Sequence, residues 1–167
     1  MVIQNQALSD ELLVMSKADQ EMRMKSINDG RDLDSSVDER NQERLESIID
    51  EHGWPTIAKV GVEASNAAWL IVQHAPDLKF MERCLNIMES LKPGEVNPAN
   101  IAYLKDRVLM HNGKPQIYGT QFQGFGKDIK VYPIDDVENV DKRRKSVGLG
   151  SFAKYESKLR GFYAKAK

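Results

Sequence analysis

Apolar residues recur at helical spacing through the first two thirds of the chain, and they predict five helices. The stretches between them contain glycine, proline, asparagine or aspartate, which commonly end helices. The predicted helices cover about residues 10–27, 36–52, 56–75, 78–91 and 98–111. Ser9 is the expected N-cap of the first helix and Asp77 that of the fourth, and Gly61 interrupts the third.

The third predicted helix differs from the others because apolar residues surround its whole axis. Its second half, from Ala64 to Ala75, reads ASNAAWLIVQHA, and a helix of this kind is covered by neighbours on every side. The polar pair Gln73 and His74 stands at the end of this apolar run. We expect both side chains to have hydrogen-bond partners, because burying an unpaired polar group costs a few kcal/mol.

The pattern changes in the last third of the chain. Residues 116–122 and 128–132 have the composition of two β-strands, with a turn at Gly124-Phe125-Gly126-Lys127. A short helix is expected at 141–147, and a last helix after the N-cap Ser151. Because a two-stranded hairpin is marginally stable alone, it must pack on helices. The predicted fold is therefore mainly α, a helical bundle of about five to six helices with one small β-hairpin in the C-terminal third.

Length and composition predict a single domain over residues 1–167, since 167 residues suit one domain of ordinary size. Hydrophobic residues make up 41% of the chain and charged residues 29%, which is typical of a globular protein. Within this domain we expect a helical body at 8–112, the hairpin at 115–133 and a C-terminal helical arm at 141–165.

A cytoplasmic location is expected from three features. Cys84 is the single cysteine, which is typical of a reducing compartment, and on its apolar helix face it is expected to be an inert core thiol. The N-terminal residues lack the basic and apolar regions of a signal peptide. The longest apolar stretch, Ala67 to Val72, is too short to cross a membrane.

Charge is unevenly placed along the chain, although its net value is −1. Residues 141–167 contain nine basic and two acidic residues, a net charge of +7. Such a segment suits a protein partner, bound through Lys142, Arg143, Arg144 and Lys145. The alternative is a solvated terminal helix that packs on an acidic body. Nucleic acid is not favoured as a partner, because aromatic residues do not alternate with the basic ones.

His74 is the candidate catalytic residue, because an imidazole titrates near neutral pH and can act as a general acid or base. The alternative is a core histidine that is hydrogen-bonded for structural reasons. Asp19 and Arg23 have the i,i+4 spacing of an ion pair on the first predicted helix. Gly119 would let a ligand or another backbone approach closely.

Several polar residues could line a pocket with His74. An arginine, a histidine, a tyrosine and an amide-rich strand suit a polar or anionic small molecule. The candidate binding residues are Gln20, Arg23, Gln73, Asp106, Arg107, Gln116, Tyr118, Thr120 and Gln121. No metal and no cofactor is expected, because the three histidines lack the spacing of zinc ligands and no nucleotide-binding motif is present.

Three long stretches carry a family resemblance: GWPTIAKVGVEASNAAWLIVQHAPDLKF, YLKDRVLMHNGKPQIYGTQF and VDKRRKSVGLGSFAKY. With the ADQEMR segment they resemble the bacterial domain-of-unknown-function family 6624, over roughly Leu12 to Tyr155. The resemblance implies one intact domain and no particular reaction. Its motif positions on this chain are Asp19, Gln20, Arg23, Gly53, Trp54, Pro55, Gly61, Gln73, His74, Asp106, Arg107, Gln116, Tyr118, Gly119, Thr120, Gln121, Asp141, Arg143 and Arg144. So many polar motif positions in one small domain imply a site rather than a core.

Two functions are open at this point. The first is a metal-independent hydrolase or transferase, with His74 as acid/base, Arg23 and Arg107 holding an anionic group, and Gln116, Tyr118 and Gln121 orienting the substrate. The second is a non-catalytic binding module (an adaptor, immunity or sensing protein). Its polar cluster would be structural, and its basic C-terminal arm would bind the partner.

Overall fold

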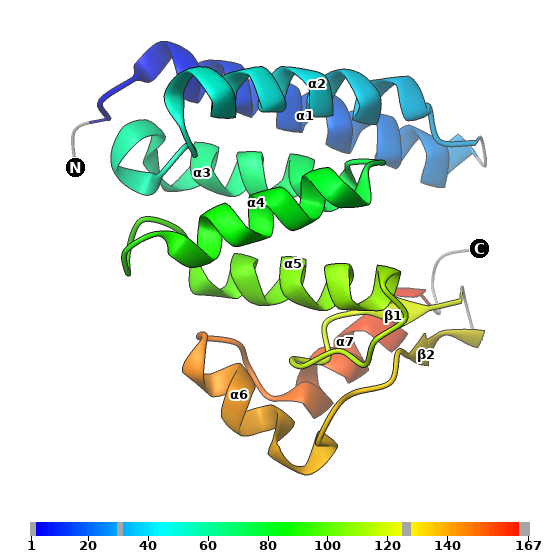
Figure 1. Cartoon of the computed structure of the whole chain (residues 1–167). Coiled ribbons are helices and arrows are strands. Elements are labelled where there is room, and N and C mark those ends of the chain that lie inside the picture. Colours follow the sequence, from blue (N-terminus) through cyan, green and yellow to red (C-terminus); the bar gives the residue numbers. More distant parts are fainter. Residues whose placement is uncertain (1–2, 30–31, 125–127, 164–167) are drawn as a thin grey trace. The chain divides into compact units, whose positions relative to one another are not determined.

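The computed structural model describes residues 3–29, 32–124 and 128–163 (Figure 1). In these residues the chain forms α1 (Gln6–Asp29), α2 (Ser35–His52), α3 (Ile57–His74), α4 (Leu78–Ser90), α5 (Pro98–His111), β1 (Phe122–Gln123), β2 (Lys130–Val131), the 3₁₀ helix η2 (Val137–Asn139), α6 (Val140–Ser146) and α7 (Phe152–Tyr163). The prediction of a mainly α protein with one small β-hairpin in its C-terminal third is confirmed.

The chain packs as two compact units, Met1–Asn97 and Pro98–Lys167. The first contains α1 to α4, and the second contains α5, the hairpin and the remaining helices. The boundary falls at the Asn97-Pro98 pair, where α5 begins at the proline, in keeping with the preference of proline for the first helical position. Among the described residues, no helix is both long and apolar enough to cross a membrane.

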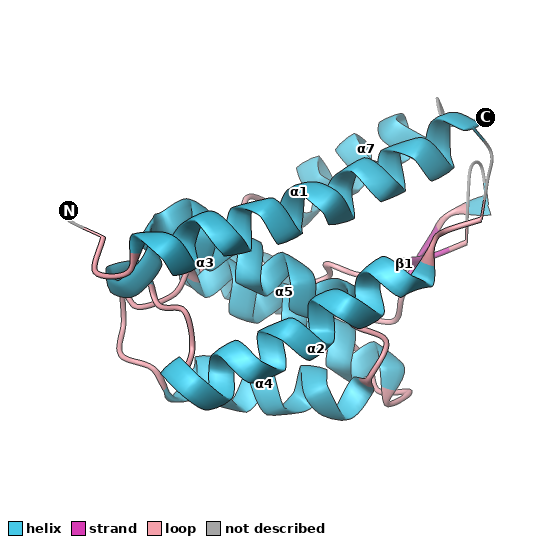
Figure 2. Cartoon of the chain, turned by 90° about the horizontal axis from the view of Figure 1, so that it is seen from above, coloured by secondary structure: helices cyan, strands magenta, loops and turns pink. Residues whose placement is uncertain are grey.

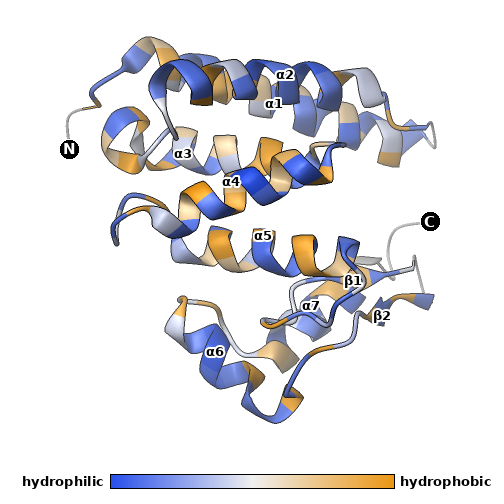
Figure 3. Ribbon diagram, in the orientation of Figure 1, coloured by the Kyte–Doolittle hydropathy of each residue, from blue (hydrophilic) through white to orange (hydrophobic). Residues whose placement is uncertain are grey.

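In the first unit α3 is the central helix, in contact with α1, α2 and α4. Figures 1 and 2 show α1 running alongside it. Apolar residues recur along α3, whereas α2 carries mostly polar ones (Figure 3). The buried apolar side chains of α3 include Ala64, Ala68, Ile71 and Val72. The apolar pattern around the whole axis of this segment therefore predicted its central place.

The break predicted at Gly61 is present, because this residue has φ 83° and ψ 166° inside α3. A positive φ favours glycine, and a Cβ built there would lie 3.1 Å from the Ile3 side chain.

The prediction of Ser9 as an N-cap is wrong. The α1 helix begins at Gln6, the Asn5 side chain accepts from the Leu8 amide, and the buried Ser9 hydroxyl donates to the Val60 carbonyl beside the break (2.7 Å).

The first strand expected in the second unit is wrong over most of its length. Of residues 116–122, only Phe122 belongs to a strand, and β1 pairs with β2 through Phe122 opposite Val131 and Gln123 opposite Lys130. Residues 117–120 instead wrap around the Asp106 carboxylate, which accepts backbone hydrogen bonds that a strand would form with its neighbour. Of the turn expected at 124–127, residues 125–127 lie outside the described residues.

Candidate functional site

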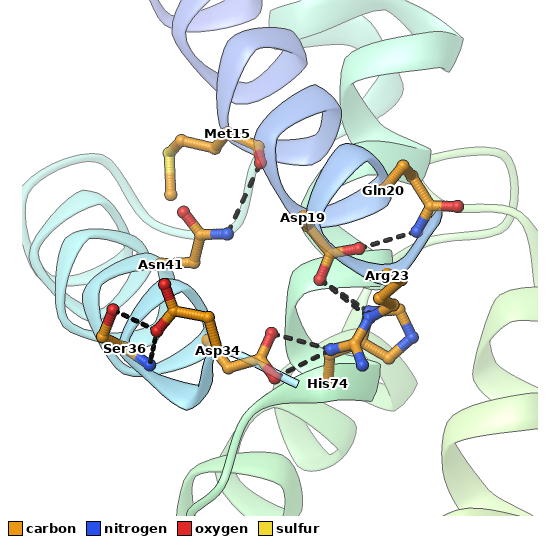
Figure 4. Close-up of polar contacts among 9 residues, drawn as sticks. Met15, Asp19, Gln20, Arg23, Asp34, Ser36, Asn41 and His74 are labelled. Carbon is orange, nitrogen blue, oxygen red and sulfur yellow. Dashed lines mark hydrogen bonds and ion pairs between the residues drawn. The ribbon is translucent and has the colours of Figure 1, made fainter. Parts of the chain in front are cut away.

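The centre of the candidate site in the first unit is a contact between α1 and α3. Asp19 Oδ1 lies 2.8 Å from Nδ1 of His74, which ends α3 (Figure 4). The other oxygen of the carboxylate, Oδ2, accepts a hydrogen bond from the Gln20 side chain at 2.6 Å. The Asp19 side chain is 1% exposed, so this carboxylate is satisfied by protein groups instead of water.

Arg23 joins this pair to α2. Its Nε lies 3.3 Å from Asp19 Oδ1 and 3.0 Å from His74 Nδ1. Its Nη2 lies 2.7 and 2.8 Å from the two carboxylate oxygens of Asp38, in the first turn of α2. The helix begins after the N-cap Asp34, whose side chain accepts from the Ser36 amide (Figure 4). Arg23 therefore connects all three helices that meet at His74.

The two neighbours of His74 Nδ1 make opposite demands on this atom. The Asp19 carboxylate needs a proton on Nδ1, whereas the Arg23 Nε–H needs a lone pair there. The contact with the buried carboxylate is the shorter of the two, and Arg23 Nε–H has Asp19 Oδ1 as another acceptor. The geometry thus favours a proton on Nδ1 and a lone pair on Nε2.

The two carboxyl groups near Arg23 differ in acidity. Burial alone would raise the pKa of Asp19, but hydrogen bonds from His74 and Gln20 and the charge of Arg23 outweigh it, so this pKa is lowered. Burial raises the pKa of Asp38, and the charge and hydrogen bonds of Arg23 offset this only in part. Asp19 is therefore the more firmly ionised partner in the cluster.

This cluster lies at the edge of the protein core. The His74 side chain is 19% exposed and that of Arg23 21%. Among the described residues, Nδ1 carries every hydrogen bond of His74, and Nε2 has none. The neighbouring Gln73 is buried. The His74 side chain is therefore partly exposed, and none of the described residues binds its Nε2, the nitrogen that carries the lone pair.

A second polar group forms in the second unit around Asp106, which is fully buried in α5. Its carboxylate accepts from the amides of Ile117, Tyr118 and Thr120 at 2.7 to 3.1 Å, and from the Thr120 hydroxyl at 2.9 Å. These bonds use the carboxylate to shape the loop. Asp106 thus acts as a structural anchor.

Gln116 has a similar anchoring role in this loop. Its side chain accepts from the Gln121 amide at 2.8 Å and donates to the Gln121 and Tyr132 carbonyls at 2.9 and 2.7 Å.

The close approach expected at Gly119 is made by the Phe152 side chain, because a Cβ on Gly119 would lie 2.8 Å from the Phe152 ring. Arg107, Thr120 and Gln121 line a cavity of about 190 Å³ in the same unit.

The four basic residues expected to meet a partner divide into two kinds. Arg144 is 1% exposed and donates to the Gly150 and Tyr118 carbonyls at 2.6 and 2.7 Å. Arg143 donates to the Ile117, Asp135 and Asp136 carbonyls. Both hold loops in place, so Arg144 is not available as a surface contact. Only Lys142 and Lys145 are exposed.

Two residues of the first cluster were missing from the candidate site. The sequence pairs Asp19 with Arg23 and includes it among the motif positions of the family, but does not assign it to the site, and it does not single out Asp38. The i,i+4 spacing on α1 was the available signal for Asp19. Asp38 has no such signal, because an acidic residue in the first turn of a helix is commonplace.

Other reactive groups lie outside these clusters. Cys84 is fully buried, and burial raises the pKa of its thiol to about 12, as expected for an inert core cysteine. In the part of the chain that the structure describes, no group of three or more histidine, cysteine, aspartate or glutamate residues could hold a metal ion.

Comparison with known proteins gives one match. The model of a family of unknown function, DUF6624, matches residues 6–166. No curated protein and no solved structure matches the chain. Because the family model spans nearly the whole chain, including both polar groups described above, the protein belongs to the family of unknown function DUF6624.

Proposed function

We propose that this protein is a metal-independent hydrolase or transferase that acts on a polar small molecule, with His74 as its general acid/base. The observation that supports this is the 2.8 Å contact between the buried Asp19 carboxylate and His74 Nδ1. A carboxylate in this position orients the imidazole and stabilises its protonated form, while Nε2 takes the proton from water or a substrate hydroxyl.

The charges of the cluster limit the substrate. Asp19 and Asp38 carry two negative charges against the one positive charge of Arg23, whose Nε and Nη2 both face carboxylates. An anionic group beside His74 would be repelled by the surplus negative charge. We therefore assign Arg23 a positioning role and expect a neutral or cationic group next to the imidazole.

The first experiment determines the tautomer of His74 and needs no substrate. Long-range ¹H–¹⁵N NMR spectra at a pH where the ring is neutral should show the proton on Nδ1. If the proton is on Nε2, then Nδ1 accepts from Arg23, no base faces solvent and the proposal fails. The Asp19→Asn variant should shift this equilibrium, because an amide can also donate to Nδ1.

The second experiment measures turnover of chromogenic ester, amide and glycoside substrates. His74→Gln and Asp19→Asn should lose activity together, whereas His52→Gln, which alters a histidine with a 45% exposed side chain, should keep it. General acid/base catalysis typically contributes about 10²–10⁴-fold in rate, so the loss in His74→Gln should fall in this range. A residual activity within this range is expected in His74→Gln, whereas activity equal to that of the wild type would contradict the role of His74.

The binding module is the second candidate, and the role of Arg23 favours it. This side chain ties α1, α2 and α3 together through Asp19, His74 and Asp38, as a purely structural network would. In that case His74→Gln should lower the melting temperature strongly, while His52→Gln should not. A folded but inactive His74→Gln protein would support the enzyme.

A further inference from the structure

Asp19 binds three polar side chains, and each of them has one polar atom left over (Figure 4). The carboxylate lies 2.6 Å from Gln20 Nε2, 3.3 Å from Arg23 Nε and 2.8 Å from His74 Nδ1. Gln20 Oε1, Arg23 Nη1 and His74 Nε2 have no hydrogen-bond partner among the described residues. The Asp19 cluster, which consists of these four residues and Asp38, therefore offers an acceptor, a donor and a base.

The orientation of the Gln20 amide follows from the charge of Asp19. An ionised carboxylate can only accept hydrogen bonds, so the NH₂ group of the amide faces it and the carbonyl oxygen points elsewhere. The lowered pKa of Asp19 keeps its carboxylate ionised at neutral pH. Because Gln20 is exposed, its Oε1 is an oriented acceptor for a molecule that arrives from solvent.

Arg23 has a donor left over in the same way. Its Nε and Nη2 face the carboxylates of Asp19 and Asp38, which leaves the two N–H groups of Nη1. The side chain is 21% exposed, so it is not sealed in the core. Arg23 follows Gln20 by three residues on α1, and the Cβ atoms of such neighbours are about 5–6 Å apart on one face of a helix. Because both side chains also bind one carboxylate, a single small functional group can reach the free acceptor and the free donor.

The charge of the cluster decides which functional group fits. Two carboxylates oppose one guanidinium, so a carboxylate or phosphate on the ligand would be repelled. An ammonium group suits the charge but has no acceptor for Arg23 Nη1, and an ester has no donor for Gln20 Oε1. A neutral amide has both, because it carries an N–H and a C=O in one planar group. The cluster therefore selects a carboxamide or a ureido group.

We propose that the Asp19 cluster binds a neutral primary amide, whose N–H donates to Gln20 Oε1 and whose carbonyl oxygen accepts from Arg23 Nη1. His74 Nε2 remains for the water or hydroxyl whose proton it takes, and in this respect the inference rests on the proposed function. Gln20 and Arg23 then contact the substrate and determine its class.

The first test measures binding to the wild-type protein by fluorine NMR, with three probes that share a trifluoromethyl group. Trifluoroacetamide has both the N–H and the carbonyl, N,N-dimethyltrifluoroacetamide lacks the N–H, and trifluoroacetate is an anion without a donor. Trifluoroacetamide should bind at least about tenfold more tightly than either of the others, the factor that corresponds to ~1.4 kcal/mol. Equal affinity for either of the other probes, or no binding of trifluoroacetamide at tens of millimolar, would overturn the proposal.

The acceptor is tested with Gln20→Met, which preserves the length of the side chain and removes its amide. In this variant trifluoroacetamide should bind no more tightly than its dimethyl derivative, a change that a purely structural role of Gln20 does not predict. Gln6→Met is the matched control, because Gln6 is also exposed on α1 and donates to an aspartate, Asp10, at 2.7 Å. If the preference for trifluoroacetamide survives in Gln20→Met, or is lost equally in Gln6→Met, Gln20 is not the acceptor.

The donor is tested with Arg23→Lys, which preserves the charge and removes Nη1. Binding of trifluoroacetamide should weaken about tenfold or more, as expected for a lost hydrogen bond to a charged group. Arg44→Lys is the control, because Arg44 also joins α2 to α1, through Nε and Nη2 on the Glu11 carboxylate. Equal losses in both variants would refute the role of Arg23. If Arg23→Lys does not fold, guanidinium ¹H–¹⁵N NMR of the wild type decides, since trifluoroacetamide should shift the Nη1 signals of Arg23 and unchanged signals would refute the contact.

Turnover separates this inference from the proposed function. If the chromogenic substrates are turned over but the three probes bind alike, the amide site is wrong and catalysis by His74 stands. If trifluoroacetamide binds with the expected preference but no substrate is turned over, the amide site stands and the catalysis fails.

Discussion

The Asp106 carboxylate is the best place to test whether a side chain determines the shape of the 116–121 loop. Four donors point at its two oxygens: the amides of Ile117, Tyr118 and Thr120, and the Thr120 hydroxyl. The residue is fully buried, so water cannot replace a lost acceptor. We consider Asp106→Asn, which keeps the size of the side chain and replaces one acceptor oxygen by an NH₂ donor.

Either orientation of the new amide leaves donors facing each other. If the NH₂ takes the place of Oδ2, it meets the Thr120 amide and hydroxyl, and if it takes the place of Oδ1, it meets the Ile117 amide. The hydroxyl can rotate, but a backbone amide cannot. A hydrogen bond to a charged group contributes about 1.5–3 kcal/mol, and an orphaned buried donor costs ~1–3 kcal/mol. We expect a loss of about 2–4 kcal/mol in the free energy of unfolding.

Urea denaturation measures the global effect, and hydrogen exchange shows where it arises. The amides of Ile117, Tyr118 and Thr120 should exchange much faster in Asp106→Asn than in the wild type. Asp135→Asn is the control, because it removes the same charge from an exposed position, and its effect should stay within about 0.5 kcal/mol. If both variants unfold at the same urea concentration and these three amides keep their protection, the carboxylate does not hold the loop.

Two further predictions concern the first unit. Burial would raise the pKa of Asp19, but the hydrogen bonds to its carboxylate and the charge of Arg23 lower this pKa below the ordinary value of 3.8. The ionised carboxylate therefore stabilises the fold above pH 3.8, and this stabilisation is lost as the pH falls through the lowered pKa. Asp19→Asn should therefore reduce stability at neutral pH and have little effect in strong acid. Thermal unfolding of both proteins across the acid range measures this, and a difference in melting temperature that does not change with pH would contradict it. Gly61→Ala should cost about 1–2 kcal/mol because φ is 83°, whereas Gly150→Ala, with open space around its Cα, should be neutral in the same melting experiment.

Most helix positions could be predicted because their signals are local. Asp77 caps α4 by accepting from the Lys79 amide two residues later, and Pro98 begins α5. The break at Gly61 was predictable because only glycine readily adopts its backbone conformation. The central place of α3 followed from apolar residues around its whole axis. In each case the determining groups lie within a few residues of one another.

The wrong predictions share a physical cause, which is competition from a distant polar group. The composition of residues 116–122 predicted a strand, but the Asp106 carboxylate, 11 to 14 residues away, accepts hydrogen bonds from their backbone amides. Ser9 had the composition of an N-cap, but its hydroxyl binds the Val60 carbonyl, 51 residues away. Arg144 was expected at the surface, yet the carbonyls of a distant loop hold it in the interior.

The sequence by itself determined the helices, the small hairpin and the presence of polar residues at the end of an apolar helix. It did not determine which of these residues meet. Asp19 and His74 are 55 residues apart, and Arg23 and Asp38 are 15 apart on different helices. Their contacts depend on how α1, α2 and α3 pack, and the packing arises from apolar burial summed over many side chains. Only the tertiary structure therefore decided that the carboxylate nearest His74 is Asp19, and that Arg23 faces carboxylates.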